Sequence, residues 1–187
     1  MTLAEALAVA LMALPCPRDE PADQCQPWRA TVAEAIAEAA EEATCSGEWA
    51  QPECKPAYRG AADELAAHLV EIGHHESGFR RRIQAGDCRL DECDHHRGVF
   101  LARSMWQIHR TPELPRVEAL VPRRRWLAIQ GTAPEAVRLA ARTAARVLVS
   151  NPSAFGVTLR SVGKRGQSTQ RILARIRAAT APREATE

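Results

Sequence analysis

The chain has 187 residues, which is enough for one compact core and marginal for two. Hydrophobic residues make up 45% and exclude wholesale disorder, while only 4% are aromatic and alanine is abundant, a balance that favours packed helices over a β-sandwich. With 25 basic and 23 acidic residues the net charge is +2, so the composition does not require a nucleic-acid partner.

Residues 2–14 have helical composition, and Pro15 ends the run. The apolar part is too short to cross a membrane. It is also a poor signal peptide, because no basic residue precedes it and Glu5 interrupts it. The Ala-Leu-Pro before Cys16 matches a lipoprotein cleavage site only weakly. We therefore expect a core helix and no standard export signal.

Loops and helices alternate in the next part of the chain. Residues 16–27, with three prolines and two cysteines, predict a loop, and residues 28–44 predict a helix because their apolar side chains recur at helical spacing. Residues 45–57 contain further cysteines and prolines and are expected to form a connection. Because residues 1–57 hold too little apolar surface to stand alone, we expect them to pack on the main core.

The main domain is expected over residues 58–180, in a mainly α fold. Apolar periodicity predicts helices over about residues 59–76, 133–150 and 168–179. Residues 79–110 show no sustained period and are interpreted as a long functional loop or short β-hairpins. The polar tail, residues 181–187, is expected to fray.

Six cysteines fall in three close pairs: Cys16 with Cys25, Cys45 with Cys54, and Cys88 with Cys93. Such spacings predict a disulfide framework formed in an oxidising compartment, with reduced thiols as the alternative. A structural zinc site is a further alternative, because histidines accompany the third pair; its candidate ligands are His74, His75, Cys88, Cys93, His95 and His96. Their spacing matches no recognised zinc finger.

The most informative segment spans residues 61–79. Leu65, Leu69 and Ile72 lie on one helix face, and four residues later the same face presents Glu76. Gly78 supplies the left-handed residue that commonly ends a helix. Burial and the negative end of the helix dipole both disfavour a carboxylate anion, so we expect this acid to keep its proton, as a general acid must. On position alone, a solvated side chain at a frayed helix end is the more common arrangement.

Two motifs give the segment a family resemblance. Residues 75–79, His-Glu-Ser-Gly-Phe, resemble the Glu-Ser-Gly-Phe motif of lytic transglycosylases and goose-type lysozymes. At residues 102–108, Ala-Arg-Ser-Met-Trp-Gln-Ile stands where that superfamily has Ala-x-Gly-Leu-Met-Gln-Ile. The resemblance covers residues 61–111 and becomes fainter through the following helices. It implies a lysozyme-like helical domain that cleaves the β-1,4 bond between N-acetylmuramic acid and N-acetylglucosamine in peptidoglycan.

The resemblance also implies roles for single residues. Glu76 would be the only acid/base, Gln107 would help hold the substrate, and no cofactor or metal would be needed. Further substrate contacts are expected from residues in or near the motifs: Ser77, Ser104, Trp106, Ile108 and Arg160. Ser104 stands where the family usually has Gly, and Arg160 stands where it has the Tyr of a Tyr-Asn-Ala-Gly motif.

Several points stay open at this stage. Trp106 either stacks on a sugar ring or packs in the core, whereas packing is expected for Trp28, Trp49 and Trp126. Attack by the sugar's own 6-hydroxyl would make a lytic transglycosylase, and attack by water would make a muramidase. A second carboxylate could come from the loop, although solvation is the more common state for its acids: Asp87, Asp91, Glu92 and Asp94.

Function classes other than a glycosidase have less support in the sequence. The arginine runs at 80–82 and 123–125 lack the interleaved aromatics and the basic excess of a nucleic-acid interface, so we expect no nucleic-acid partner. The alternatives are a degenerate protein that binds glycan without cutting it and a zinc-stabilised structural protein. For the glycosidase we expect a monomer in the periplasm or the extracellular cell wall, and a phage lysis or tail protein would fit.

Overall fold

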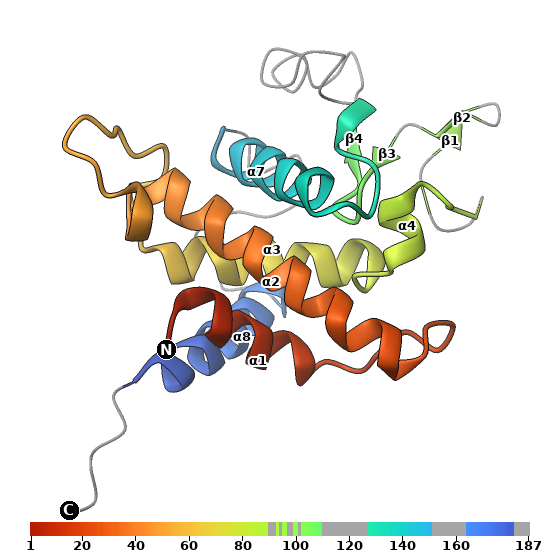
Figure 1. The fold of residues 1–187 in the computed structure, drawn as a ribbon, viewed down its shortest axis with the longest axis horizontal. Helices are drawn as coiled ribbons and strands as arrows, with labels where there is room; N and C mark the ends of the chain where they lie inside the picture. The colour runs from red at the N-terminus through yellow and green to blue at the C-terminus, as the bar shows by residue number, and fades with distance from the viewer. Residues whose placement is uncertain are drawn as a thin grey trace, which may run out of the picture.

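The computed structural model describes residues 1–89, 93, 95–96, 99–100, 102–109, 127–150 and 164–181. The fold is mainly helical, as the composition predicts (Figure 1). Its helices are α1 (Leu3–Met12), α2 (Ala22–Thr44), the 3-10 turn η1 (Gly47–Trp49), α3 (Ala62–Ser77), α4 (Arg81–Ala85), α7 (Pro134–Ser150) and α8 (Lys164–Thr180). Residues 182–187, most of the expected frayed tail, lie outside the described residues.

The first helix begins with a capping box. The Thr2 hydroxyl accepts a hydrogen bond from the Glu5 backbone N–H at 3.2 Å, and the Glu5 carboxylate accepts one from the Thr2 N–H at 2.8 Å. The acid that interrupts the apolar run therefore fixes the start of a helix whose other face is buried. In the part of the chain that the structure describes, no helix is both long and apolar enough to cross a membrane.

The second helix starts earlier than predicted. It begins at Ala22, so the expected loop at residues 16–27 is wrong in its second half. Pro21 occupies the position before the helix, where its fixed backbone angle is tolerated, and Pro27 lies near the start, where it removes one backbone hydrogen bond. Burial of Cys25 and Trp28 on this first part of the helix offsets that loss.

A buried arginine joins the first two helices. Arg29 of α2 is buried, and its guanidinium donates hydrogen bonds to three backbone carbonyls at the end of α1: those of Leu11, Leu14 and Pro15. Carbonyls at the end of a helix lack the next turn of N–H donors, so a cation there supplies donors to them and complements the negative end of the helix dipole.

One apolar cluster unites the helices. It includes Leu7 and Leu11 of α1, Ile36 of α2, Leu65 of α3, and the apolar faces of α7 and α8. Helix α3 contacts α2, α7 and α8, and α2 packs on both α1 and α7 (Figure 1). Many of the buried residues of α2 and α7 are alanines, which permit helices to approach closely. The segment 1–57 thus shares its core with the rest of the chain.

The chain after α3 is largely irregular, and the places of its short strands determine what surrounds the candidate site. The described strands are two residues long and form two antiparallel pairs: β1 (His95–His96) with β2 (Val99–Phe100), and β3 (Ala102–Arg103) with β4 (Ile108–His109). Helix α4 and the β3–β4 pair lie near the C-terminal end of α3 (Figure 1).

All three predicted cysteine pairs are disulfides: Cys16–Cys25, Cys45–Cys54 and Cys88–Cys93. The alternative of reduced thiols is therefore wrong for this structure. Each bridge closes a short local loop and ties an irregular segment to a helix or to the segment after α4. Disulfides of this kind are compatible with an extracellular or periplasmic protein.

Candidate active site

Glu76 lies in the last turn of α3, on the helix whose inner face carries Leu65, Leu69 and Ile72. Those three side chains are buried as predicted, and Glu76 is half-buried at the edge of the core. Its carboxyl group forms no hydrogen bond or ion pair with any described residue. A half-buried carboxyl with no partner among the described residues is available to an external group.

The residues that follow Glu76 are fixed by local hydrogen bonds. The Ser77 hydroxyl is buried; it donates to the Gly73 carbonyl at 3.1 Å and accepts from the Phe79 N–H at 3.1 Å. Gly78 ends the helix with φ +61°, and Phe79 follows with φ +59°, a conformation that bulky residues rarely adopt. The Phe79 carbonyl in turn accepts a hydrogen bond from the Trp28 indole at 2.8 Å. The backbone beside Glu76 is therefore held on several sides.

Gly73 permits the second motif to approach the first. A Cβ atom at this position would lie 2.4 Å from Cε1 of Phe79 and 3.1 Å from Nε1 of Trp106. The Trp106 indole donates to the Leu69 carbonyl of α3 at 3.0 Å, across 37 residues of sequence. The second motif is thus in direct contact with the helix that carries the first motif. We call residues 73–84 together with 104–108 the motif junction.

The second motif forms a tight turn with two left-handed residues. Ser104 has φ +64° and Gln107 has φ +48°, and the Gln107 N–H donates to the Ser104 carbonyl at 3.1 Å. Position 104, where the resembling family usually has Gly, is therefore one that favours glycine in this chain too. The Ser104 hydroxyl accepts a hydrogen bond from the Trp106 N–H at 3.3 Å, which gives the serine a local partner.

Gln84 is a buried polar residue that the sequence analysis missed. Its side chain is 0% exposed. The amide nitrogen donates to the carbonyls of Ile129 at 2.7 Å and Gly131 at 3.0 Å, and the amide oxygen accepts from the Met105 N–H at 3.1 Å. One side chain on α4 thereby connects the second motif to the segment before α7. No local sequence signal marks it, since it stands beside arginines in a short helix.

The structure assigns inward positions to most of the expected substrate contacts. Ser77, Ser104, Trp106 and Ile108 are buried, and Trp106 is 0% exposed, so packing and not sugar stacking is its role in this structure. Gln107 is 7% exposed, and its amide nitrogen donates to the Ser104 carbonyl at 3.3 Å and to the Cys93 sulfur at 3.2 Å. In this structure these side chains therefore pack within the protein. Arg160 lies outside the described residues.

The structure describes some of the remaining tryptophans and candidate second carboxylates, and others lie outside the described residues. Trp28 is buried as expected, Trp49 is half-buried, and Trp126 lies outside the described residues. Among the candidate second carboxylates, Asp87 is exposed in the segment after α4. The other three are not among the described residues: Asp91, Glu92 and Asp94.

A pocket of about 610 Å³ opens beside the end of α3. It is lined by residues 15–19 together with His74, Gly78, Arg80 and Arg89, so two neighbours of Glu76 in the sequence face it. Asp19 pairs with Arg80 at 3.4 Å and with Arg82 at 2.9 Å, which engages the first arginine run. Partial desolvation lowers the pKa of His74, and the charges of Arg29 and His75 lower it further. The surroundings of this helix end are therefore electropositive.

The structural zinc site that the sequence offers as an alternative would have no sulfur ligands. Cys88 and Cys93 are bonded to each other, so neither is a thiolate that could bind the metal. Within the described residues, no group of three or more histidine, cysteine or acidic side chains is arranged to hold a metal ion. The two cysteines instead form the predicted disulfide, which holds the segment beside Gln107.

Comparison of the chain with protein-family models, with curated proteins and with solved structures found no match.

Proposed function

We propose that this protein is a peptidoglycan-cleaving glycosidase, a lytic transglycosylase or a muramidase, in which Glu76 is the single acid/base. The observation that carries the proposal is the half-buried Glu76 carboxyl, unpaired among the described residues, at the end of a helix against whose middle the second motif packs through Trp106. Phe79, three residues after Glu76, has the left-handed φ of +59°, and strain of this kind at a non-glycine residue is often found at functional sites.

The mechanism starts with the proton on Glu76. The carboxyl group gives this proton to the oxygen between N-acetylmuramic acid and N-acetylglucosamine, and the glycosidic bond breaks. The substrate's acetamido group stabilises the oxocarbenium-like centre, so no second carboxylate is required. The carboxylate then removes a proton from the attacking hydroxyl. Attack by the sugar's 6-hydroxyl gives a 1,6-anhydro product, and attack by water gives a reducing end.

The electropositive pocket beside the end of α3 supports this substrate class. Peptidoglycan carries carboxylates on its peptide stems, and arginines at a surface attract such groups. Among the described residues, this pocket is lined by Arg18, Arg80 and Arg89 and by a single carboxylate, Asp19, which is already paired. The proposal places the protein in the periplasm or outside the cell, where both the substrate and the oxidising conditions for the three disulfides occur.

The test is digestion of purified sacculi by the full-length, disulfide-bonded chain, with mass analysis of the released muropeptides. The Glu76→Gln variant should lose about a hundredfold to ten-thousandfold in rate, the contribution typical of a general acid/base. Glu34→Gln is the matched control, because Glu34 is exposed on α2, far along the sequence from both motifs. It should keep the wild-type rate.

The muropeptides released by digestion distinguish the remaining interpretations of the function. Anhydro-muropeptides identify a transglycosylase and reducing ends identify a muramidase. Wild-type protein that sediments with sacculi but releases nothing would contradict the proposal in favour of glycan binding alone. A Glu76→Gln variant with the wild-type rate and an unchanged circular dichroism spectrum would remove the catalytic assignment.

A further inference from the structure

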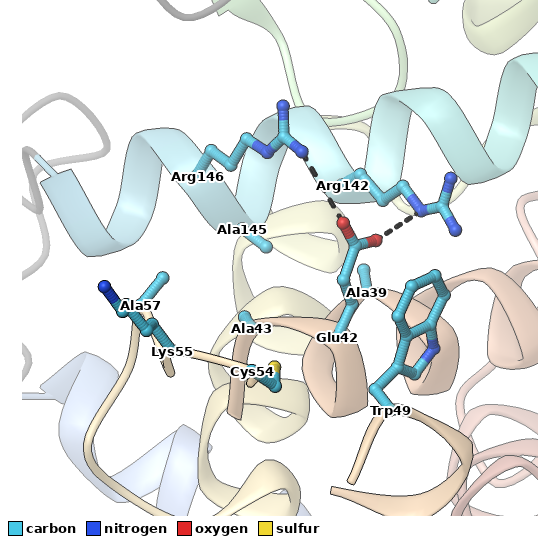
Figure 2. A pocket seen from close by; sticks show the side chains of 10 residues that line it. All are labelled: Ala39, Glu42, Ala43, Trp49, Cys54, Lys55, Ala57, Arg142, Ala145 and Arg146. Atoms are coloured by element: carbon cyan, nitrogen blue, oxygen red, sulfur yellow. Dashed lines mark ion pairs between the residues drawn. The ribbon is translucent and has the colours of Figure 1, made fainter. Parts of the chain in front are cut away.

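A second pocket, of about 340 Å³, lies between α2, the segment after η1, and α7 (Figure 2). Its apolar wall consists of alanines of α2 and α7 and the Trp49 ring, and charged side chains surround it. Ala57, on its rim, precedes α3, whereas Glu76 ends α3. The 16 residues of that helix separate the two sites by roughly 24 Å. We call this site the Trp49 pocket.

The Trp49 pocket carries a surplus of positive charge. Three cations, Lys55, Arg142 and Arg146, line it with a single carboxylate, Glu42. Glu42 pairs with Nε of Arg142 at 2.6 Å and with Nη2 of Arg146 at 3.5 Å (Figure 2). Arg142 has a second carboxylate partner, Glu38, at 2.7 Å.

The surplus is concentrated on two side chains. Within the described residues, Arg146 holds only the longer contact to Glu42, and its side chain is 48% exposed. Lys55 is exposed and forms no ion pair within the described residues. Both are therefore able to approach an anion without first giving up a close carboxylate partner.

The walls of the pocket are fixed by contacts of their own. The Arg142 guanidinium lies over the Trp49 ring, 5.4 Å from its centroid. The Cys45–Cys54 disulfide ties the segment before Lys55 to the end of α2, and the Tyr58 N–H donates to the Ala43 carbonyl at 2.9 Å. A site with preformed walls loses less entropy when a ligand binds.

We infer that the Trp49 pocket binds a small organic anion, whose carboxylate or phosphate faces Arg146 and Lys55 while its apolar body lies on the alanines and Trp49. The volume is at the lower end of the range for ligand pockets, which suits a body the size of an amino acid or a monosaccharide. Arginine and lysine are the side chains that bind both oxyanions. This inference does not rest on the proposed glycosidase activity.

The test follows the Trp49 indole N–H signal by NMR in the full-length chain, assigned with a Trp49→Phe variant. Three probes are titrated to millimolar concentrations: N-acetyl-alanine, its uncharged amide, and methyl phosphate. We expect saturable shifts with at least one of the two anions and none with the amide. Tighter binding of N-acetyl-alanine identifies a carboxylate ligand, and tighter binding of methyl phosphate identifies a phosphate ligand.

Charge variants locate the binding. Arg146→Met and Lys55→Met should each weaken it about tenfold, the size of one charge-assisted hydrogen bond. Arg138→Met is the matched control, because Arg138 is also on α7, pairs with Glu38 at 3.1 Å and is 44% exposed, but does not line the pocket. The inference is overturned if neither anion moves the signal, if the amide binds as well as the acid, or if Arg138→Met weakens binding as much as Arg146→Met.

Discussion

In the helical core of α2, α3 and α7, the buried side chains are mainly alanine, valine, leucine and isoleucine, and the described polar exceptions outside the motif junction are Arg29, Glu71 and Thr143. In the motif junction, four polar residues are buried beside the apolar ones: Ser77, Gln84, Ser104 and Gln107. The core is stabilised by apolar burial, which depends little on direction. The junction depends on hydrogen bonds, which fix both distance and angle.

Backbone strain follows the same division. Of the four described non-glycine residues with positive φ, three lie in the junction, namely Phe79, Ser104 and Gln107; the fourth, Cys45, ends α2. Strain of this kind persists only where the surroundings determine it and is often found at functional sites. A helical scaffold built from small apolar residues can therefore carry a rigid site when hydrogen bonds of polar side chains fix the positions of its atoms.

Substitution of Gln84 by Leu is expected to show the largest effect. It removes the partners of the Ile129 and Gly131 carbonyls and of the Met105 N–H, and each buried orphan costs about 1–3 kcal/mol. We expect a loss of about 3 kcal/mol in the free energy of unfolding, measured by urea denaturation. Ile36→Val in the core, the comparison variant, should cost about 1 kcal/mol. Equal losses would contradict the division between the two regions.

Gly73→Ala is expected to have the next largest effect. The new methyl group would meet the Phe79 ring at 2.4 Å, and overpacking of this kind costs about 2 kcal/mol. Because the ring must move, glycan cleavage should fall as well. Gly78→Ala is the control: no atom lies within 4 Å of its Cβ, but φ is +61°, so it should cost about 1 kcal/mol through the backbone alone. If Gly78→Ala lowers the free energy of unfolding by more than Gly73→Ala does, contact with the Phe79 ring is not the main reason for glycine at position 73.

The helical core was largely predictable because its signals are local. Apolar spacing predicts α3, α7 and α8 within a few residues, and cysteine spacing predicts all three disulfides. The start of α2 was not predictable in this way. Prolines and cysteines at residues 16–27 resemble a loop, and only the tertiary burial of Cys25 and Trp28 makes the second half helical.

The motif junction was predictable only in its outline. The motifs point to Glu76 and to the residues around it, but whether a side chain faces a substrate or the core depends on partners distant in sequence. Gln84 bonds to residues 21 and 45 positions away, and Trp106 to one 37 positions away. No local pattern encodes such partners, so the sequence leaves open whether Trp106 stacks on a sugar or packs in the core, and it does not reveal that Gln107 is buried.

A pair of substitutions at Ser104 tests the strain directly. Ser104→Gly relieves the left-handed backbone and loses the hydrogen bond from the Trp106 N–H, so the two effects of about 1 kcal/mol nearly cancel. Ser104→Ala keeps the strain and loses the bond, and should cost about 1 kcal/mol. Thermal unfolding of both variants measures the difference. A Gly variant less stable than the Ala variant would show that the backbone at 104 is not strained.

The smallest expected effect lies in the core and depends on pH. His68 of α3 is half-buried, and its Nδ1 atom is buried without a hydrogen-bond partner among the described residues. Desolvation lowers the pKa of His68, and the nearby Glu64 opposes this only in part. The folded state therefore binds a proton at this side chain less readily than the unfolded state does.

The sign of the pH dependence follows from that difference. Above the ordinary histidine pKa of about 6.5 both states are neutral and His68 costs nothing. As the pH falls below that value the unfolded state takes up the proton first, so stability decreases until the folded-state pKa is reached. We expect a contribution of about a few tenths of a kcal/mol, since part of the ring contacts solvent and is screened. His68→Leu should therefore flatten the slope of unfolding free energy against pH below about 6.5, whereas the motif junction variants should leave that slope unchanged. An unchanged slope would mean that protonation of His68 does not affect the free energy of unfolding. The helical core and the motif junction would then differ more in their dependence on polar groups than the burial of His68 implies.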